Sequence, residues 1–265
     1  MKVPVIVENR PGAGGLLATR DVKGATPDGT RLLIADIGFS ASASLYREAR
    51  YNPTRDFAAI ASLASVASIL TVRAASPYGS LAGLVAAAKQ RSGAITMASG
   101  GIGGSAHLIG AMFASQAGFV PTHVPYRGMG PAMTGIIAGE ADFIVATAPV
   151  AMPFIQDHRA GALAVASAKR VGLLPEIATF AEQAYPGVVA DDVYGIVGPV
   201  GLPAEMVMVL HREITAIART ASFTQRLMPL GMTGLPMDSP QAYAAFLRDD
   251  FTKWRDVIER NNIGG

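Results

Sequence analysis

The sequence predicts an α/β protein with mostly parallel sheets, and three observations indicate this class. Short apolar segments typical of strands alternate with segments of helical periodicity along the 265 residues, which is the pattern of βαβ units. Loops rich in glycine and small residues follow several of these strands, where open α/β sheets place their ligands. Half of the residues are hydrophobic and 16% are charged, so the chain has enough apolar surface for one large core or two modest ones.

The predicted strands are short runs of apolar and β-branched residues. They comprise residues 3–7, 31–35, 69–73, the stretch around Ile95, and residues 122–125, 143–146, 163–166 and 194–197. The first of them is expected to be buried. Residues 36–42 are rich in small side chains, and we expect them to form a loop at the carboxyl end of the second strand.

Helices are predicted where apolar residues recur at spacings of three and four positions. They comprise residues 16–23, 81–88, 108–113, 131–137, 204–219 and 240–260. Ser239 is a candidate N-cap of the last helix, because a serine hydroxyl there accepts a hydrogen bond from the first turn. Pro131 is expected near the first position of its helix, where an N–H group is not needed.

Composition and charge exclude several classes of function. The chain has no cysteine, which excludes disulfides, thiolate metal sites and cysteine nucleophiles. The net charge is only +2, and no basic cluster interleaved with aromatic residues indicates a nucleic-acid partner. No apolar run reaches about 18 residues, the length of a membrane span, and residues 1–7 are too short for a signal peptide. His123, His158 and His211 lack metal-ligand spacing, so no metal or cofactor is expected.

The most informative stretch is residues 97–107, in which a short strand is followed by a glycine loop and then by a helix. Glycines let the backbone approach a ligand closely. The free N–H groups of the first helical turn point at such a ligand, and the helix dipole favours negative charge there. We therefore expect an acidic small molecule over Gly100 to Ser105.

Other interpretations of the same residues remain open or are weaker. The spacing of Gly101, Gly103 and Ala106 formally fits a dinucleotide fingerprint, but no acidic residue follows about 20 positions later. Ser105 and His107 lack the Gly-x-Ser-x-Gly elbow and are two positions apart on a helix, so they do not face each other. His107 is either part of a ligand wall or structural, and Arg127 either pairs with a carboxylate or is an exposed loop residue.

Several motifs occur in an order that resembles the Bug family, the TctC-like solute receptors of tripartite tricarboxylate transporters. The motifs are residues 5–15, 27–29, 45–46, 51–57, 100–107, 124–128, 130–132, 139–142, 164–170, 174–176 and 185–187. The resemblance covers essentially the whole chain. It implies a two-lobed, type II periplasmic-binding-protein fold with a hinge, in which residues 1–90 and 195–265 form lobe 1 and residues 93–192 form lobe 2.

The resemblance also implies a function: a non-enzymatic, monomeric periplasmic receptor that captures a carboxylate between its lobes and delivers it to a membrane permease. No catalytic residue, metal or cofactor is then expected. Two alternatives stay open at this point. One is an enzyme that acts on an acidic substrate through Ser105 or His107, and the other is a truncated remnant that does not bind.

The ligand-binding residues follow from matching the family motifs to this sequence. In the second lobe they are Ser99, Gly100, Gly101, Ile102, Gly103, Gly104, Ser105 and His107, with a neighbouring wall of Tyr126, Arg127 and Gly128. Phe39 and Ser40 are expected to contribute from the first lobe, and Asp192 is a further candidate.

The sequence departs from the family pattern in two respects. Family members begin with an export signal, a strand and a loop rich in proline and glycine, whereas this chain starts one strand later, so its first lobe is expected to lack that strand. The family often has an acidic residue where Ala146 or Thr147 stands. Its absence is expected to favour diacids over ligands that carry an amine.

Overall fold

The computed structural model describes residues 4–10, 15–46, 48–91 and 93–263. They form two compact units. Unit 1 comprises Met1–Ser65, Val193–Arg226 and Thr233–Gly265, and unit 2 comprises Val66–Asp192 and Leu227–Met232. The sequence-based boundary at residue 90 differs from this division, because residues 66–90 pack with unit 2 through a strand in the middle of its sheet.

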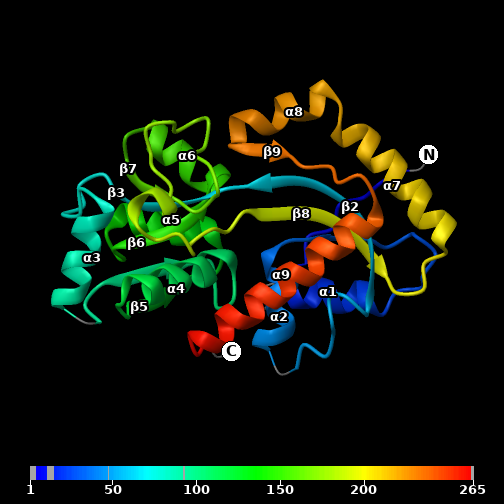
Figure 1. The fold of residues 1–265 in the computed structure, drawn as a ribbon, viewed down its shortest axis with the longest axis horizontal. Coiled ribbons are helices and arrows are strands. Elements are labelled where there is room, and N and C mark those ends of the chain that lie inside the picture. The colour runs from blue at the N-terminus through cyan, green and yellow to red at the C-terminus, as the bar shows by residue number, and fades with distance from the viewer. Residues whose placement is uncertain (1–3, 11–14, 47, 92, 264–265) are drawn as a thin grey trace. The chain divides into compact units, whose positions relative to one another are not determined.

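Unit 1 combines a mixed sheet with helices from both ends of the chain (Figure 1). Its elements, some of which extend by one residue into unit 2, are α1 (Leu16–Lys23), β1 (Leu33–Ala35), α2 (Ile37–Leu45), β2 (Phe57–Val66), β8 (Asp192–Pro199), α7 (Ala204–Ala218), α8 (Ala221–Leu227), β9 (Met232–Gly234) and α9 (Pro240–Arg260). The strand order within the described residues is β1-β8-β2-β9, and β1 runs antiparallel to β8.

The core of unit 1 is built around aromatic side chains from α2, the segment after it and β2. The Phe39 ring stacks on Tyr51 at 5.8 Å between centroids and meets Phe57 edge-on at 5.0 Å, which are favourable aromatic geometries. Helix α9 packs on α2 and buries Trp254 completely. Ser239 caps α9 as predicted, because its hydroxyl accepts a hydrogen bond from Ala242 N–H at 3.1 Å.

Unit 2 contains a five-stranded sheet in the order β5-β4-β6-β3-β7. Its elements are β3 (Ser68–Arg73), α3 (Leu81–Gln90), β4 (Thr96–Ser99), α4 (Ser105–Ala117), β5 (Thr122–Pro125), α5 (Met129–Ala138), β6 (Phe143–Thr147), α6 (Ala148–Gln156), β7 (Ala160–Val165) and the 3₁₀ turns Ala181–Gln183 and Met228–Leu230. Helix α4 packs on β4 and β6, and α5 packs on β3, β4 and β6.

The α/β class is confirmed, but the sheets are mixed and not mostly parallel. β4 runs parallel to β5 and β6, whereas β3 runs antiparallel to β6 and β7. Parallel pairing follows each βαβ unit as expected. The antiparallel pairs come from β3, whose strand neighbours are distant in sequence, and an alternation of strands and helices does not reveal such pairings.

Three local predictions are wrong. Residues 4–7 form no strand, and the Val5, Ile6 and Val7 side chains are 77–88% exposed; residue 3 lies outside the described residues. Residues 37–42 are helical and belong to α2, because the Asp36 carboxylate accepts a hydrogen bond from Phe39 N–H and so caps that helix. Pro131 is at the third position of α5.

One buried side chain and several elements also differ from the sequence-based predictions. Because His211 falls in a predicted helix of surface type, the sequence predicts a solvated side chain, but His211 is buried and its Nδ1 lies 2.8 Å from the Ile60 carbonyl oxygen. Strands β2 and β9 and helices α6 and α8 were not predicted. No described helix has the combination of length and apolar character that a membrane crossing requires.

Candidate functional site: the carboxyl edge of the unit 2 sheet

The glycine loop and the loop after β5 meet at one edge of the unit 2 sheet. β4 lies between β5 and β6 and runs parallel to both, with Ser99 opposite Pro125, so the carboxyl ends of the three strands share that edge. Tyr126 N–H donates to the Ser99 carbonyl at 2.8 Å, and Gly128 N–H donates to the Gly100 carbonyl at 3.0 Å. The two loops that the sequence placed at strand ends therefore form one continuous backbone surface.

Glycine is required at two places in this surface. A Cβ at Gly100 would lie 2.9 Å from Met129 N and 3.0 Å from Gly128 C, so the loops contact each other backbone to backbone. Gly103 has a φ of +77°, in the left-handed region that side chains disfavour. Gly100 therefore allows the backbone contact between the two loops, and Gly103 allows the left-handed turn within the glycine loop.

Helix α4 begins in this loop with its first turn unobstructed by a capping side chain. Its N-cap is Gly104, which has no side chain to accept a hydrogen bond. The hydrogen bonding of the helix begins when Leu108 N–H donates to the Gly104 carbonyl at 3.1 Å. By helix geometry, the N–H groups of Ser105, Ala106 and His107 come before that ladder and point out of the helix end. Together with the helix dipole, they favour an anion.

Several amides of the glycine loop are already used inside the loop. Gly101 N–H donates to Ser99 Oγ at 3.1 Å, and Gly103 N–H donates to His107 Nδ1 at 3.1 Å. Gly104 N–H donates to the Gly101 carbonyl at 3.3 Å. The sequence-based expectation of an amide cradle over the whole of residues 100–105 is therefore narrowed to the first turn of α4.

Two histidines stack directly behind the loop. The rings of His107 and His123 are 3.8 Å apart between centroids and 6° from parallel, and His123 Nε2 lies 2.7 Å from Ser99 Oγ. Burial, followed by the charge that His123 would carry, lowers the pKa of His107 to about 4. Burial lowers the pKa of His123 as well. Both imidazoles are consequently neutral at pH 7.

Tyr126 and Arg127 lie in the adjoining loop, but the Tyr126 hydroxyl bonds elsewhere. The hydroxyl donates to Glu140 Oε2 at 2.9 Å. The ring lies against Gly135, where a Cβ would come within 2.3 Å of the hydroxyl oxygen. The Tyr126 hydroxyl is therefore engaged within unit 2, and the binding role of Tyr126 stays a prediction. Arg127 is exposed, and its binding role stays a prediction, as does that of Gly128.

The predicted residues of unit 1 are buried. Phe39 is 3% exposed and Ser40 is 0% exposed. Asp36 occupies the N-terminus of their helix by accepting from Phe39 N–H at 3.1 Å. Burial raises the pKa of this carboxyl. The Phe39 ring serves the core of unit 1, and the binding roles of Phe39 and Ser40 stay predictions.

The remaining candidates and the residues missed by the sequence analysis lie on other strands. Asp192 is 1% exposed and opens β8, and its role is likewise untested. Ser68 was missed. It faces Thr147 in the β3–β6 pairing at the same carboxyl edge, and its buried Oγ lacks a hydrogen-bond partner in the described part of the chain. The antiparallel β3 brings Ser68 there, so strand–loop–helix patterns gave no signal for it.

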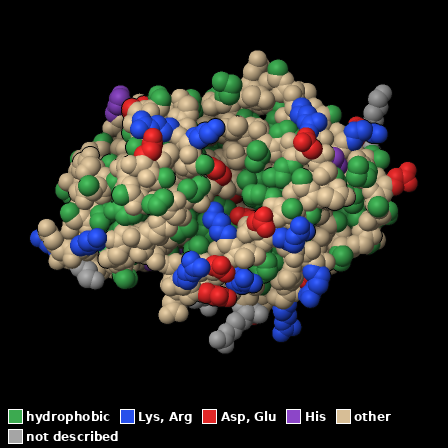
Figure 2. All heavy atoms as spheres, viewed as in Figure 1, with side chains coloured by type: hydrophobic (Ala, Val, Ile, Leu, Met, Phe, Trp, Pro, Cys, Tyr) green, Lys and Arg blue, Asp and Glu red, His purple; other side chains and the backbone are tan. Residues whose placement is uncertain are grey.

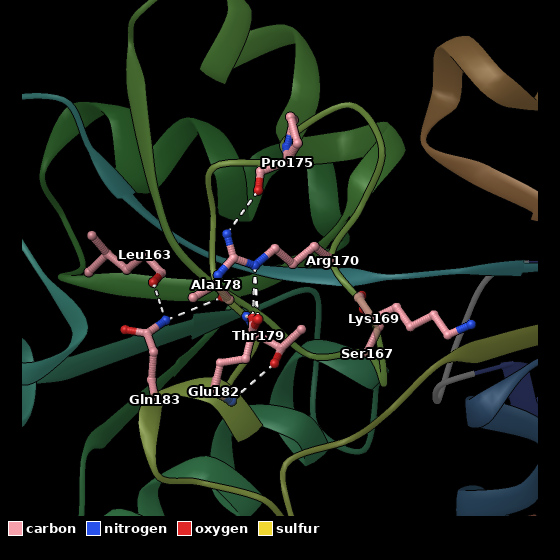
Figure 3. A network of polar contacts seen from close by, with 9 residues as sticks. All are labelled: Leu163, Ser167, Lys169, Arg170, Pro175, Ala178, Thr179, Glu182 and Gln183. Carbon is pink, nitrogen blue, oxygen red and sulfur yellow. Dashed lines mark hydrogen bonds and ion pairs between the residues drawn. The ribbon is translucent and has the colours of Figure 1, made fainter.

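The segment after β7 carries two more basic residues, which Figure 3 shows at close range. The Arg170 Nε donates to both Glu182 carboxylate oxygens at 3.0 Å, and its guanidinium also donates to the Pro175 carbonyl. The Arg170 guanidinium therefore stabilises the segment after β7 that contains Pro175 and Glu182. In the same view the Lys169 side chain extends away from this network, and Lys169 is exposed.

Two further features of the described residues concern metal-ligating side chains and surface charge. The described residues contain no group of three histidine or carboxylate side chains placed to hold a metal ion. On the face drawn in Figure 2, basic and acidic side chains are interspersed. The first-turn N–H groups of α4 at the carboxyl edge of unit 2 are donors that suit a small anion.

The chain is similar to several known proteins over almost its whole length. Residues 1–263 match the model of the TctC family, described as the tripartite tricarboxylate transporter family receptor. A UPF0065 protein encoded in the tcbD–tcbE intergenic region of Pseudomonas sp. strain P51 is 32% identical over 255 residues, which are 96% of this chain and 76% of that protein.

Solved structures of similar proteins include two that were determined with carboxylates. The periplasmic binding protein BugD has a TM-score of 0.88 at 29% identity, over 98% of this chain and 87% of that one. Rpa4515 of R. palustris, solved with adipate, has a TM-score of 0.90 at 28% identity over the same shares. MatC of Rhodopseudomonas palustris, solved with malate, has a TM-score of 0.88 at 25% identity, over 96% of this chain and 88% of that one.

Proposed function

The chain belongs to the TctC family of tripartite tricarboxylate transporter receptors, which includes the Bug proteins, and on this premise we propose that it is a periplasmic receptor for a small carboxylate. We further propose that it acts as a monomer and delivers its ligand to the membrane permease of such a transporter. The ligand carboxylate binds the first turn of α4 at the carboxyl edge of unit 2.

The observation that carries this proposal is the N-terminus of α4, which lacks a capping side chain and lies beside the backbone surface formed by the glycine loop and the loop after β5. Gly104 leaves the first-turn amides of Ser105 and Ala106 without a capping side chain. Backbone N–H groups can donate hydrogen bonds to the carboxylate of any acid. This agrees with the different acids named for two similar structures, adipate and malate. Ala146 and Thr147 stand where the family often has an acid, and we propose that diacids are preferred for this reason.

An enzymatic function is the weaker alternative. The His107 Nδ1 already accepts a hydrogen bond from Gly103 N–H, and its low pKa of about 4 makes it a poor general base. Turnover of a bound acid would support an enzyme, because a receptor releases its ligand unchanged.

The experiment is a thermal-shift screen of the 265-residue chain against mono-, di- and tricarboxylates, followed by calorimetric titration with adipate and malate. A ligand at about 100 times its Kd adds about 2.7 kcal/mol of stability, which raises the melting temperature by several degrees. If no acid shifts the melting temperature or gives binding heat, the carboxylate-receptor proposal fails and the non-binding alternative gains support.

A charge variant locates the site. In Ser105→Asp the new carboxylate stands about 5 Å from a bound carboxylate, and repulsion at an effective dielectric of about 20 amounts to about 3 kcal/mol. We expect a loss of affinity of at least about tenfold. Ser115→Asp carries the same charge at the exposed C-terminal end of α4, about 15 Å along the helix, and is the matched control. Equal affinities of the two variants would exclude the first turn of α4 as the site.

A further inference from the structure

The two stacked histidines of unit 2 have a geometry that the anion site alone does not require. Their rings are 3.8 Å apart and nearly parallel, and each ring bonds to a different part of the glycine loop. His107 Nδ1 accepts from Gly103 N–H at 3.1 Å, and His123 Nε2 lies 2.7 Å from Ser99 Oγ. Ser99 in turn accepts from Gly101 N–H at 3.1 Å.

This arrangement connects both ends of the glycine loop to one rigid pair of rings. Ser99 is the last residue of β4, and Gly103 immediately precedes the N-cap of α4. His107 is on α4 and His123 is on β5. The stack therefore links three elements that the loop must bring together, and its His107 ring accepts a hydrogen bond from Gly103, whose φ of +77° is left-handed.

We propose that His107 and His123 are positioning residues, which hold the glycine loop in its anion-binding shape through two neutral, stacked imidazoles. The proposal rests on the proposed function of this edge, and it adds how the site is kept in place. Neither ring needs to touch the ligand. His107 acts through Gly103 and His123 acts through Ser99.

The electrostatic surroundings agree with neutral rings. Between Thr96 and Thr147 the charged side chains are Arg127, Glu140 and Asp142. Glu140 bonds to the Tyr126 hydroxyl, and Asp142 accepts from Thr96 at the opposite end of β4. Neither of these two carboxylates bonds to an imidazole in the described part of unit 2. The pKa of His107 is lowered by burial and by His123, and that of His123 by burial.

Protonation of His107 has a specific geometric consequence. A proton on Nδ1 would face the Gly103 N–H group, and two donors cannot share a hydrogen bond. The positive ring would also lie against His123 and in the first turn of α4, where the helix dipole disfavours a cation. The Gly103 hydrogen bond therefore breaks when His107 is protonated.

The first test uses the ligand-free protein and the ¹H–¹⁵N resonance of Gly103. Between pH 7.5 and 4 the proposal predicts that this resonance moves together with the His107 ring signals, with a midpoint well below the ordinary histidine value of about 6.5. A Gly103 resonance that does not follow His107, or a His107 midpoint near 6.5, would overturn the proposal. This result does not depend on whether any carboxylate binds.

The second test uses adipate affinity at pH 7.5 and three variants. His107→Phe keeps a stacking ring but removes the acceptor, and we expect about a five- to tenfold loss of affinity, the effect of one neutral hydrogen bond. His107→Asn places an amide oxygen near the position of Nδ1, and it is expected to recover part of that loss and to abolish the titration of Gly103. His158→Asn is the control, because His158 is exposed with a φ of 55° that asparagine tolerates.

The outcomes separate the two proposals. Wild-type binding with an unaffected His107→Phe variant would refute positioning by the histidines while leaving the carboxylate receptor intact. If no acid of the thermal-shift screen binds the wild type while Gly103 still titrates with His107, the proposed ligand class is refuted and the positioning of the glycine loop by His107 is supported.

Discussion

The contact between the two loops of the candidate site makes Gly100→Ala the sharpest structural perturbation. The new Cβ would lie 2.9 Å from Met129 N and 3.0 Å from Gly128 C, which is closer than carbon atoms approach in proteins. Backbone atoms cannot rotate away as a side chain does, so the loop after β5 must move by a few tenths of an ångström. Overpacking of this kind costs about 1–3 kcal/mol.

A matched glycine four residues further along the same loop provides the control. A Cβ at Gly104 would lie 3.5 Å from the Gly101 carbonyl oxygen, an ordinary contact, and the φ of −71° suits any residue. Gly104→Ala is therefore expected to cost less than about 1 kcal/mol, the loss typical of a weaker N-cap.

The assay is urea unfolding of both variants without ligand, with the midpoint and the slope fitted separately. The structure predicts a lower midpoint for Gly100→Ala at an unchanged slope, and a near-normal midpoint for Gly104→Ala. Equal midpoints for the two variants would refute the backbone contact between the loops, and with it the continuous surface on which the site depends.

Three further predictions concern stability. The pKa of His107 is about 4 in the folded state and about 6.5 in the unfolded chain, so the unfolded chain binds more protons and the free energy of unfolding falls by about 2–3 kcal/mol as pH drops from 6.5 to 4. The urea midpoint should decrease over this pH range in the wild type and should decrease much less in His107→Asn. Asp142→Ala removes an acceptor that lies 2.8 Å from both Thr96 N and Thr96 Oγ1, and thermal unfolding should show a loss of about 1.5–3 kcal/mol; an unchanged melting temperature would contradict it. Burial raises the pKa of Asp56, but Lys23 and the other hydrogen-bond donors outweigh burial and lower the pKa to about 2, so the ionised carboxylate stabilises the fold above pH 3.8 and this effect is lost toward pH 2. Lys23→Gln should reduce the loss of stability between about pH 4 and pH 2, and an identical loss in the variant and the wild type would show that the ion pair contributes nothing.

Much of the fold was predictable because it depends on local sequence. Helices α1, α3, α7 and α9 follow from apolar periodicity, and the parallel arrangement of β4, β5 and β6 follows from βαβ units. The antiparallel position of β3 was not predictable, because its pairing with β6 and β7 joins residues far apart in the chain. Helix α2 was missed since its small residues resemble a loop and only the Asp36 cap marks its start.

The candidate site was predictable to a similar extent. The glycine loop and the loop after β5 were placed correctly because both follow strands that read clearly in the sequence. The stacking of His107 on His123 and the approach of Ser68 to Thr147 depend on strand register, which the sequence pattern does not reveal. The orientation of the Tyr126 hydroxyl toward Glu140 depends on a space left by Gly135, a tertiary contact.

The central claim is that a carboxylate binds at the first turn of α4, and amide chemical shifts test it most directly. ¹H–¹⁵N spectra of the ¹⁵N-labelled chain would be recorded with and without saturating adipate and malate. We predict that the largest perturbations fall on the amides of Ser105, Ala106 and His107, with smaller ones at Gly100 and Met129. Binding with these amides unperturbed, and with the largest changes elsewhere in the chain, would contradict the account.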